Sequence, residues 1–127
     1  MMTVDITEVR ELFFEESFES LDIMESNLLD LDIGTTDREL INSIFRSAHS
    51  IKGSAGIFKF EEVITFAHVA ETLLDEMRNG EHLVTQDIID VLLSFVDIMR
   101  MMLSALQEKG EYDVHSVLEC QNQLRSF

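Results

Sequence analysis

Apolar residues recur every three or four positions along most of this chain, which is the spacing of one buried helix face. The pattern predicts long helices over residues 6–31, 37–56, 61–79 and 86–108, and a shorter helix from residue 113. No segment shows the alternation of a half-buried strand. The connections are short, which makes neighbouring helices antiparallel. We therefore expect one all-α domain over residues 1–127: an antiparallel up-and-down four-helix bundle with a short C-terminal fifth helix.

Capping residues mark several of these helix ends. Asp5 and Thr36 each stand three positions before a glutamate, which is the spacing of a capping box at a helix start. Thr85 is placed to cap the fourth helix, and Gly80 follows the third. The boundaries given by periodicity and by capping therefore agree.

The predicted core draws on all four long helices. Its members are Phe13, Phe14, Phe18, Leu21, Met24, Leu28, Leu31, Ile41, Ile44, Ala48, Ile51, Ala55, Val63, Phe66, Ala70, Leu73, Leu74, Met77, Ile88, Leu92, Phe95, Met99, Met102 and Leu106. Phe58 and Phe60 follow the second helix, and we expect them to fill one end of this core.

Composition narrows the class of protein. A chain of 127 residues is long enough for one domain with its own core. Its single cysteine, Cys120, cannot form an internal disulfide, and no long apolar run or basic leader is present. We expect a cytoplasmic protein that is monomeric in isolation and not inserted in a membrane. The formal net charge of −16 argues against nucleic acid or an anionic membrane as the main partner, because their phosphates would be repelled.

The stretch SAHSIKGSAG, residues 47–56, carries the candidate chemistry. The buried stripe of the second helix passes through Ala48 and Ile51, so His49 points outward at the edge of the core. On a helix, residues three, four and seven positions apart share a face. For His49 these residues are Asn42, Phe45, Lys52, Gly53 and Gly56.

Two glycines inside a helix need an explanation, because each costs about 0.5–1 kcal/mol relative to alanine. One hypothesis is that Gly53 and Gly56 clear the surface beside the imidazole, so that a second macromolecule can reach the ring. The alternatives are that they allow a tight crossing of two helices, or that Gly56 ends the helix. The sequence leaves these alternatives open.

The segment from Leu40 to Phe60 contains none of the 25 Asp and Glu residues of the chain, although it contains Arg46, Lys52 and Lys59. Such a local positive field suits a phosphate or a carboxylate-rich pocket of a partner. A solvated, slightly basic helix face would have the same composition. Arg46, Gly53 and Gly56 are therefore candidate binding residues.

On the third predicted helix, His68 and Glu71 are three positions apart and are surface neighbours. Glu71 lies at the rim of the apolar face, from which it can reach the second helix. His68 lies farther from the centre of the core. Helix geometry therefore favours Glu71 as the partner of His49 and leaves the role of His68 open; His82 and His115 have no recognisable partner and are given no role.

AHSIKGSAG resembles the phosphorylation-site motif of histidine phosphotransfer (HPt) domains. The likeness extends, in the same order, through DITEVRELFFEES, SIFRSAHSIKGSAGIFKF and HVAETLLDEMRNGE, and it is closest to the phosphotransfer domain of CheA-type chemotaxis histidine kinases. The resemblance implies that His49 is phosphorylated and that Lys52, His68 and Glu71 are its active-site neighbours. If Glu71 accepts a hydrogen bond from Nδ1–H, the lone pair lies on Nε2, which can attack a phosphoryl group while Lys52 balances the phosphate charge.

The resemblance also implies the partners. The donor would be the ATP-binding domain of a histidine kinase, and the acceptors would be receiver domains similar to those of CheY and CheB. The chain has no GxxxxGKS, GxxxxGKT or GxGxxG run, so we expect no ATP site, no cofactor and no enzyme activity of the chain on its own. It would serve as one part of a histidine kinase, a transferase.

The sequence leaves three alternative functions open. The chain could be a stand-alone phosphorelay intermediate unconnected with chemotaxis. It could also be a metal-binding bundle, but such sites repeat Glu-x-x-His, whereas this chain has one His68-x-x-Glu71 in the reverse order, so we predict no metal ligand. A structural acidic bundle that binds a partner helix would leave the glycine pair and the segment without acids unexplained.

Overall fold

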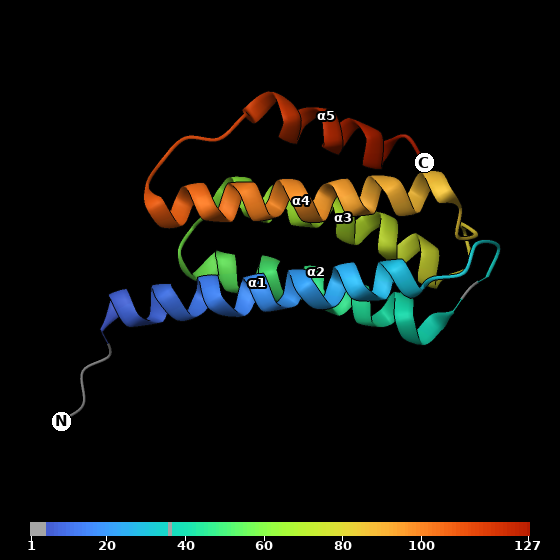
Figure 1. Cartoon of the computed structure of the whole chain (residues 1–127), viewed down its shortest axis with the longest axis horizontal. Helices are drawn as coiled ribbons and strands as arrows, with labels where there is room; N and C mark the ends of the chain where they lie inside the picture. Colours follow the sequence, from blue (N-terminus) through green and yellow to red (C-terminus); the bar gives the residue numbers. More distant parts are fainter. Residues whose placement is uncertain (1–4, 36) are drawn as a thin grey trace.

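The computed structural model describes residues 5–35 and 37–127, and all the regular secondary structure in these two segments is helical (Figure 1). The five helices are α1 (Ile6–Asp30), α2 (Arg38–Ile57), α3 (Glu61–Arg78), α4 (Gln86–Glu108) and α5 (Val114–Arg125). Each predicted boundary differs from the observed one by at most one residue. The expected all-α fold, with four long helices and a shorter fifth, is confirmed.

The four long helices form a closed ring. α2 packs between α1 and α3, and α4 packs against both α3 and α1, so the first and last long helices close the bundle. Their short connections reverse the chain at each end, which gives the up-and-down arrangement. α5 lies along the outer side of α3 and α4 (Figure 1). The surface of α2 that lies away from the core is therefore not covered by α5.

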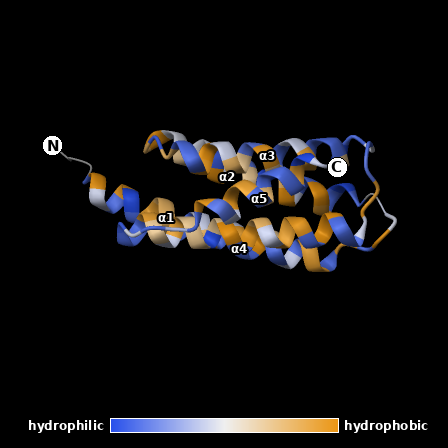
Figure 2. Ribbon diagram, turned by 90° about the horizontal axis from the view of Figure 1, so that it is seen from above, coloured by the Kyte–Doolittle hydropathy of each residue, from blue (hydrophilic) through white to orange (hydrophobic). Residues whose placement is uncertain are grey.

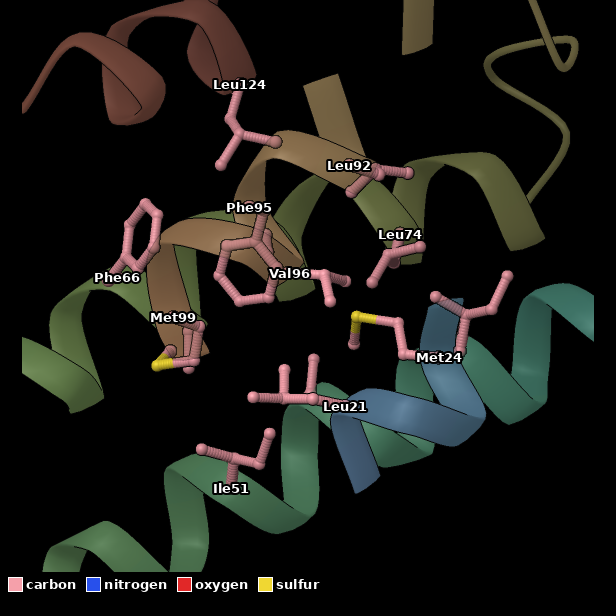
Figure 3. Close-up of a cluster of buried hydrophobic side chains, with 14 of the residues drawn as sticks. Leu21, Met24, Ile51, Phe66, Leu74, Leu92, Phe95, Val96, Met99 and Leu124 are labelled. Carbon is pink, nitrogen blue, oxygen red and sulfur yellow. The ribbon is translucent and has the colours of Figure 1, made fainter. Parts of the chain in front are cut away.

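Each helix is amphipathic, with orange apolar positions interrupted at regular intervals by blue polar ones (Figure 2). The apolar sides meet in one core, to which Leu21, Ile51, Phe66, Phe95 and Leu124 contribute from the five helices in turn (Figure 3). Phe66 and Phe95 pack with their ring centroids 4.7 Å apart. Of the core residues predicted on the four long helices, only Phe18 and Leu106 are partly rather than fully buried.

Side-chain caps begin four of the helices. The Asp5 carboxylate accepts a hydrogen bond from the backbone N–H of Thr7 at 2.9 Å, and the Thr85 hydroxyl accepts one from Ile88 at 3.2 Å, as predicted. Asp113 caps α5. Thr36, the predicted cap of the second helix, lies outside the described residues; the observed cap of α2 is Asp37, whose carboxylate accepts from the N–H of Leu40.

The end of α2 differs from one of the expectations. Gly56 does not end the helix, which continues through Ile57, and the left-handed residue that reverses the chain is Lys59, with φ of 57°. Phe58 and Phe60 stand on either side of Lys59 in the sequence. The centroids of their rings lie 5.4 Å and 5.6 Å, respectively, from the ring centroid of Phe13 on α1. They fill the end of the core as predicted.

None of the helices in the part of the chain that the structure describes has the length and apolar character needed to cross a bilayer.

Candidate functional site

His49 lies on the outer face of α2, in the second half of the helix. The apolar stripe on the opposite side of this helix holds α2 in place, since Ala48 and Ile51 are buried on either side of the histidine in sequence. The His49 side chain itself is 60% exposed. The imidazole is therefore held by a rigid helix and is open to a partner.

Glu71 of α3 reaches across to His49. Its Oε1 lies 3.2 Å from Nδ1 of the imidazole, which is the contact that helix geometry favoured. Its second oxygen, Oε2, forms an ion pair of 2.8 Å with Nζ of Lys52, one turn farther along α2. The Glu71 side chain is only 13% exposed, so one largely buried carboxylate joins the histidine and the lysine.

The charge of Glu71 depends on these two neighbours. Burial of the carboxyl acts to raise its pKa, but the hydrogen bonds and charges of Lys52 and His49 act in the opposite direction and prevail. The pKa of Glu71 therefore lies below its ordinary value of 4.5, and the group is a carboxylate at neutral pH.

A carboxylate can only accept hydrogen bonds, so Nδ1 of His49 carries the proton in its contact with Glu71. In the neutral imidazole the lone pair then lies on Nε2, the other ring nitrogen. An ammonium has three N–H donors, so the bond from Lys52 to Glu71 leaves two that can turn toward an anion on the ring. The site thus pairs an accessible nucleophilic nitrogen with a nearby positive charge.

Gly53 and Gly56 leave the surface beside His49 open. A Cβ atom built at either position would meet no heavy atom of another part of the protein within 4 Å. The structure therefore contradicts a tight helix crossing as the reason for these glycines. The open surface supports the hypothesis that they give access to the ring.

Phe45 and Arg78 form a contact beside His49 that sequence reasoning missed. The Phe45 ring lies parallel to the imidazole, with an angle of 10° between the planes and 5.9 Å between the centroids. Cζ of Arg78, at the end of α3, lies 3.9 Å from the centroid of the Phe45 ring. The shared face of Phe45 and His49 was visible in the sequence, but the approach of Arg78 depends on how α2 and α3 are packed.

The other predicted site residues, His68 and Arg46, form no ion pair or hydrogen bond with His49 within the described residues. His68 is exposed and lines a shallow pocket with Phe45 and Glu71, and no hydrogen bond joins it to His49 within the described structure. Arg46 is exposed on α2, one turn before His49. The structure therefore brings His49, Lys52 and Glu71 together, with His68 and Arg46 at the edge of the site.

Two further histidines have carboxylate neighbours, although neither was expected to have a partner. Nε2 of His82 lies 3.2 Å from Glu76, and Nε2 of His115 lies 3.8 Å from Glu119. The prediction that these histidines have no partner was wrong, because the turn after α3 brings His82 back to Glu76, and Glu119 lies one helical turn after His115. Within residues 5–35 and 37–127, no group of three or more His, Cys, Asp or Glu side chains is arranged to hold a metal ion.

Comparison with known proteins identifies the family. The family model described as the Hpt domain matches residues 8–109. The chain belongs to the Hpt domain family. This Hpt domain is 44% identical over 126 residues to the chemotaxis protein CheA of Salmonella typhimurium, an alignment that covers 99% of the chain and 19% of CheA. It spans 14% of the corresponding CheA of Rhizobium meliloti, so it corresponds to less than a fifth of either relative.

Solved structures of CheA phosphotransfer domains have the same fold. The phosphorylated P1 domain of CheA3 from R. sphaeroides, crystallised in complex with CheY6, matches with a TM-score of 0.83 and 27% identity over 94% of each chain. A solution structure of the histidine phosphotransfer domain of CheA matches with the same TM-score and 31% identity, over 97% of this chain and 93% of the other. The Hpt fold of this chain is thus that of the CheA phosphotransfer domains.

Proposed function

We propose that this Hpt domain is the phosphoryl carrier of a chemotaxis-type two-component system, and that His49 is the residue that carries the phosphoryl group. The observation that carries the proposal is the arrangement of His49, which is exposed but has Nδ1 engaged by Glu71. Only Nε2 is then available as a nucleophile. The kinship with CheA phosphotransfer domains supports the same assignment.

The reaction has two steps at one atom. The Nε2 lone pair attacks the γ-phosphorus of ATP held by a kinase catalytic domain, and the bond from that phosphorus to the leaving oxygen of ADP breaks. In the second step a carboxylate oxygen of a receiver-domain aspartate attacks the same phosphorus, and the electron pair of the P–N bond returns to Nε2. Nδ1 keeps its proton throughout, so Glu71 orients the ring in both directions of transfer.

Lys52 supplies charge to the transferred group. Its ammonium is held at the site by Glu71 and can offer its free N–H donors to the phosphoryl oxygens. Gly53 and Gly56 leave room for the kinase domain or the receiver domain, and Arg46 lies on the same helix to meet an acidic partner surface. On this proposal the chain lacks an ATP site of its own and is not an enzyme in isolation.

The partners follow from the same proposal. The donor is the ATP-binding domain of a histidine kinase, and the acceptors are receiver domains of the CheY and CheB type. The complex of the CheA3 P1 domain with CheY6 supports a receiver domain as a direct partner.

The first prediction tests the phosphorylated residue. The domain with ATP and Mg²⁺ alone should remain unlabelled, and addition of a CheA-type kinase fragment lacking its own phosphotransfer domain should produce an acid-labile, base-stable phosphate. His49→Gln should abolish the label while circular dichroism stays unchanged, because exposed substitutions usually alter stability by only about 0.5 kcal/mol.

His115→Gln is the matched control, since His115 is 85% exposed and lies on α5, and this variant should be labelled normally. Label on the His49→Gln protein, mapped to another histidine, would refute the assignment. Label on the wild-type domain without a kinase fragment would refute the absence of an ATP site.

A further inference from the structure

The hydrogen bond that His49 donates to Glu71 fixes one atom of the imidazole but not the direction of the ring plane. A single contact at Nδ1, at 3.2 Å, allows the imidazole to turn about that contact. Transfer requires Nε2 to point along the line of attack, and small errors in orientation slow such steps. A second contact is needed to define the plane of a side chain that is 60% exposed.

Phe45 provides that second contact. It precedes His49 by four positions and therefore lies beside it on the same face of α2. The planes of the two rings differ by only 10°, and their centroid separation of 5.9 Å lies within the range of favourable aromatic pairs. Rotation of the imidazole out of this plane would turn its edge toward the Phe45 ring.

Phe45 is itself held from the neighbouring helix. The Arg78 guanidinium lies 3.9 Å from the ring centroid, well within the range of a cation–π contact. Nε of Arg78 donates a hydrogen bond of 2.7 Å to Asp75, one turn earlier on α3. The guanidinium is thus fixed in position over the ring, and the contact joins α3 to α2 beside the phosphorylation site.

We propose that Phe45, held by Arg78, is a positioning residue that sets the plane of the His49 imidazole for phosphoryl transfer. The inference rests on the proposed function of His49. Glu71 selects the tautomer, and Phe45 selects the orientation, so the two contacts act on different properties of the same ring. Arg78 acts on His49 only through Phe45.

The first experiment needs no phosphoryl donor. In the unphosphorylated domain, three-bond NMR couplings from the two β protons of His49 to Cδ2 of its ring report the torsion χ2, which sets the plane of the imidazole. The wild-type protein should show two unequal couplings, and Phe45→Leu should bring them toward an averaged value. Ring ¹⁵N shifts should keep Nδ1 as the protonated nitrogen in both proteins, because Glu71 is unchanged.

The second experiment measures transfer from a CheA-type kinase fragment. Phe45→Leu should lower the maximal rate about three- to tenfold with little change in KM, which is the effect expected for the loss of one aromatic contact that orients the ring. Phe45→Tyr should restore the rate because it keeps the ring. Phe18→Leu is the matched control, because Phe18 is also a partly buried phenylalanine on a helix but lies on α1, whereas the contacts of His49 are with Phe45 and Glu71 on α2 and α3; this variant should transfer at the wild-type rate.

Arg78→Met should give a smaller loss in the same direction, and the double variant with Phe45→Leu should be no slower than Phe45→Leu alone. Unchanged couplings in Phe45→Leu, or changed couplings with an unchanged rate, would each overturn the inference. Additive losses in the double variant would overturn the role assigned to Arg78. If no protein, including wild type, accepted phosphate, the proposed function would fail together with the transfer role of Phe45, while the NMR couplings would still report the ring orientation.

Discussion

Glu71 is the residue on which the geometry of the site depends most. Its two oxygens bind different partners on α2, so it fixes the His49 tautomer and holds the Lys52 ammonium nearby. The helical pattern predicted this contact because positions 49 and 71 both fall at the rim of an apolar face. It could not predict Arg78 over Phe45, because that contact depends on the offset between two helices.

The second prediction concerns the charge of Glu71. Its pKa is lowered in the folded protein, so its stabilising contribution is present above the unfolded-state value of about 4.5 and is lost as the pH falls through the lower folded-state value. Glu71→Gln should therefore cost about 1 kcal/mol of unfolding free energy at pH 7 and close to nothing at pH 3. Urea unfolding of both proteins at the two pH values measures the difference.

In the transfer assay, Glu71→Gln should retain more activity than Glu71→Ala, because the amide oxygen can still accept from Nδ1–H. Both variants should still be labelled on His49, since neither removes the nucleophile. A pH-independent stability difference between wild type and Glu71→Gln would show that the charge of Glu71 does not contribute.

The third prediction concerns Gly53, which lies one turn from His49 on the open surface of α2. Gly53→Ala and Gly53→Leu should each stabilise the domain by about 0.5–1 kcal/mol, because both residues have higher helix propensity and a Cβ meets no neighbour. Gly53→Leu should slow transfer from the kinase fragment, whereas Gly53→Ala should have a smaller effect. Stopped assays with subsaturating kinase fragment compare the two, and a Leu variant at the wild-type rate would contradict the role of Gly53 in access.

At the scale of the helices, the boundaries were predictable because they depend on local signals: apolar period, capping residues and glycine. Apart from the contact between His49 and Glu71, the polar contacts between helices were not predictable, because their partners are far apart in sequence. Arg100 of α4 bonds Asp22 at 2.8 Å and Glu25 at 2.5 Å on α1, and Arg10 of α1 donates to the backbone carbonyl of Leu106 at 2.6 Å. These contacts lie where the first and last long helices close the ring.

The fourth prediction concerns this closure. Arg100 has lost part of its contact with water, and its pKa is raised chiefly by the hydrogen bond to Glu25, so it remains a cation that two carboxylates share. A double-mutant cycle of Arg100→Gln and Glu25→Gln should give a coupling energy of about 0.5–1 kcal/mol at low salt and a smaller value in 1 M NaCl. Urea denaturation supplies the four free energies.

Arg125→Gln controls for the loss of one positive charge from a chain of net charge −16, and Arg125 is exposed at the end of α5. This variant should change stability less than Arg100→Gln does. A coupling energy of zero between Arg100 and Glu25 would show that the α1–α4 closure depends on the apolar core alone.

At the scale of the whole molecule, α5 differs from the four long helices. It has 12 residues and covers α3 and α4 from outside, with Val117, Cys120 and Leu124 as its buried apolar contacts. Each of the long helices buries more residues in the same core. An element with few buried contacts can open at a lower free energy than the molecule as a whole. We therefore expect α5 to detach before the four-helix bundle unfolds.

Cys120 reports this opening, because it lies on the buried face of α5 and is 2% exposed in the native protein. Burial, together with the negative charge of Glu119, raises the pKa of the thiol to about 11 from its ordinary value of 9.0. A thiol reacts as the thiolate, so the native protein has about a hundredfold less reactive species near pH 8 than an exposed cysteine, in addition to steric protection. Labelling with a thiol reagent is thus limited to molecules in which α5 has moved.

The fifth prediction is that Cys120 becomes reactive at urea concentrations below the main loss of helical signal. The control is Ala70→Cys in a Cys120→Ala background, because Ala70 is fully buried in the long-helix core and cysteine is only slightly larger. Its thiol should react only as the circular dichroism signal falls, since the core opens with the whole bundle. If both thiols became reactive together at the main transition, α5 would belong to the same cooperative unit as α1–α4, and its packing on α3 and α4 would be as strong as the contacts within the ring.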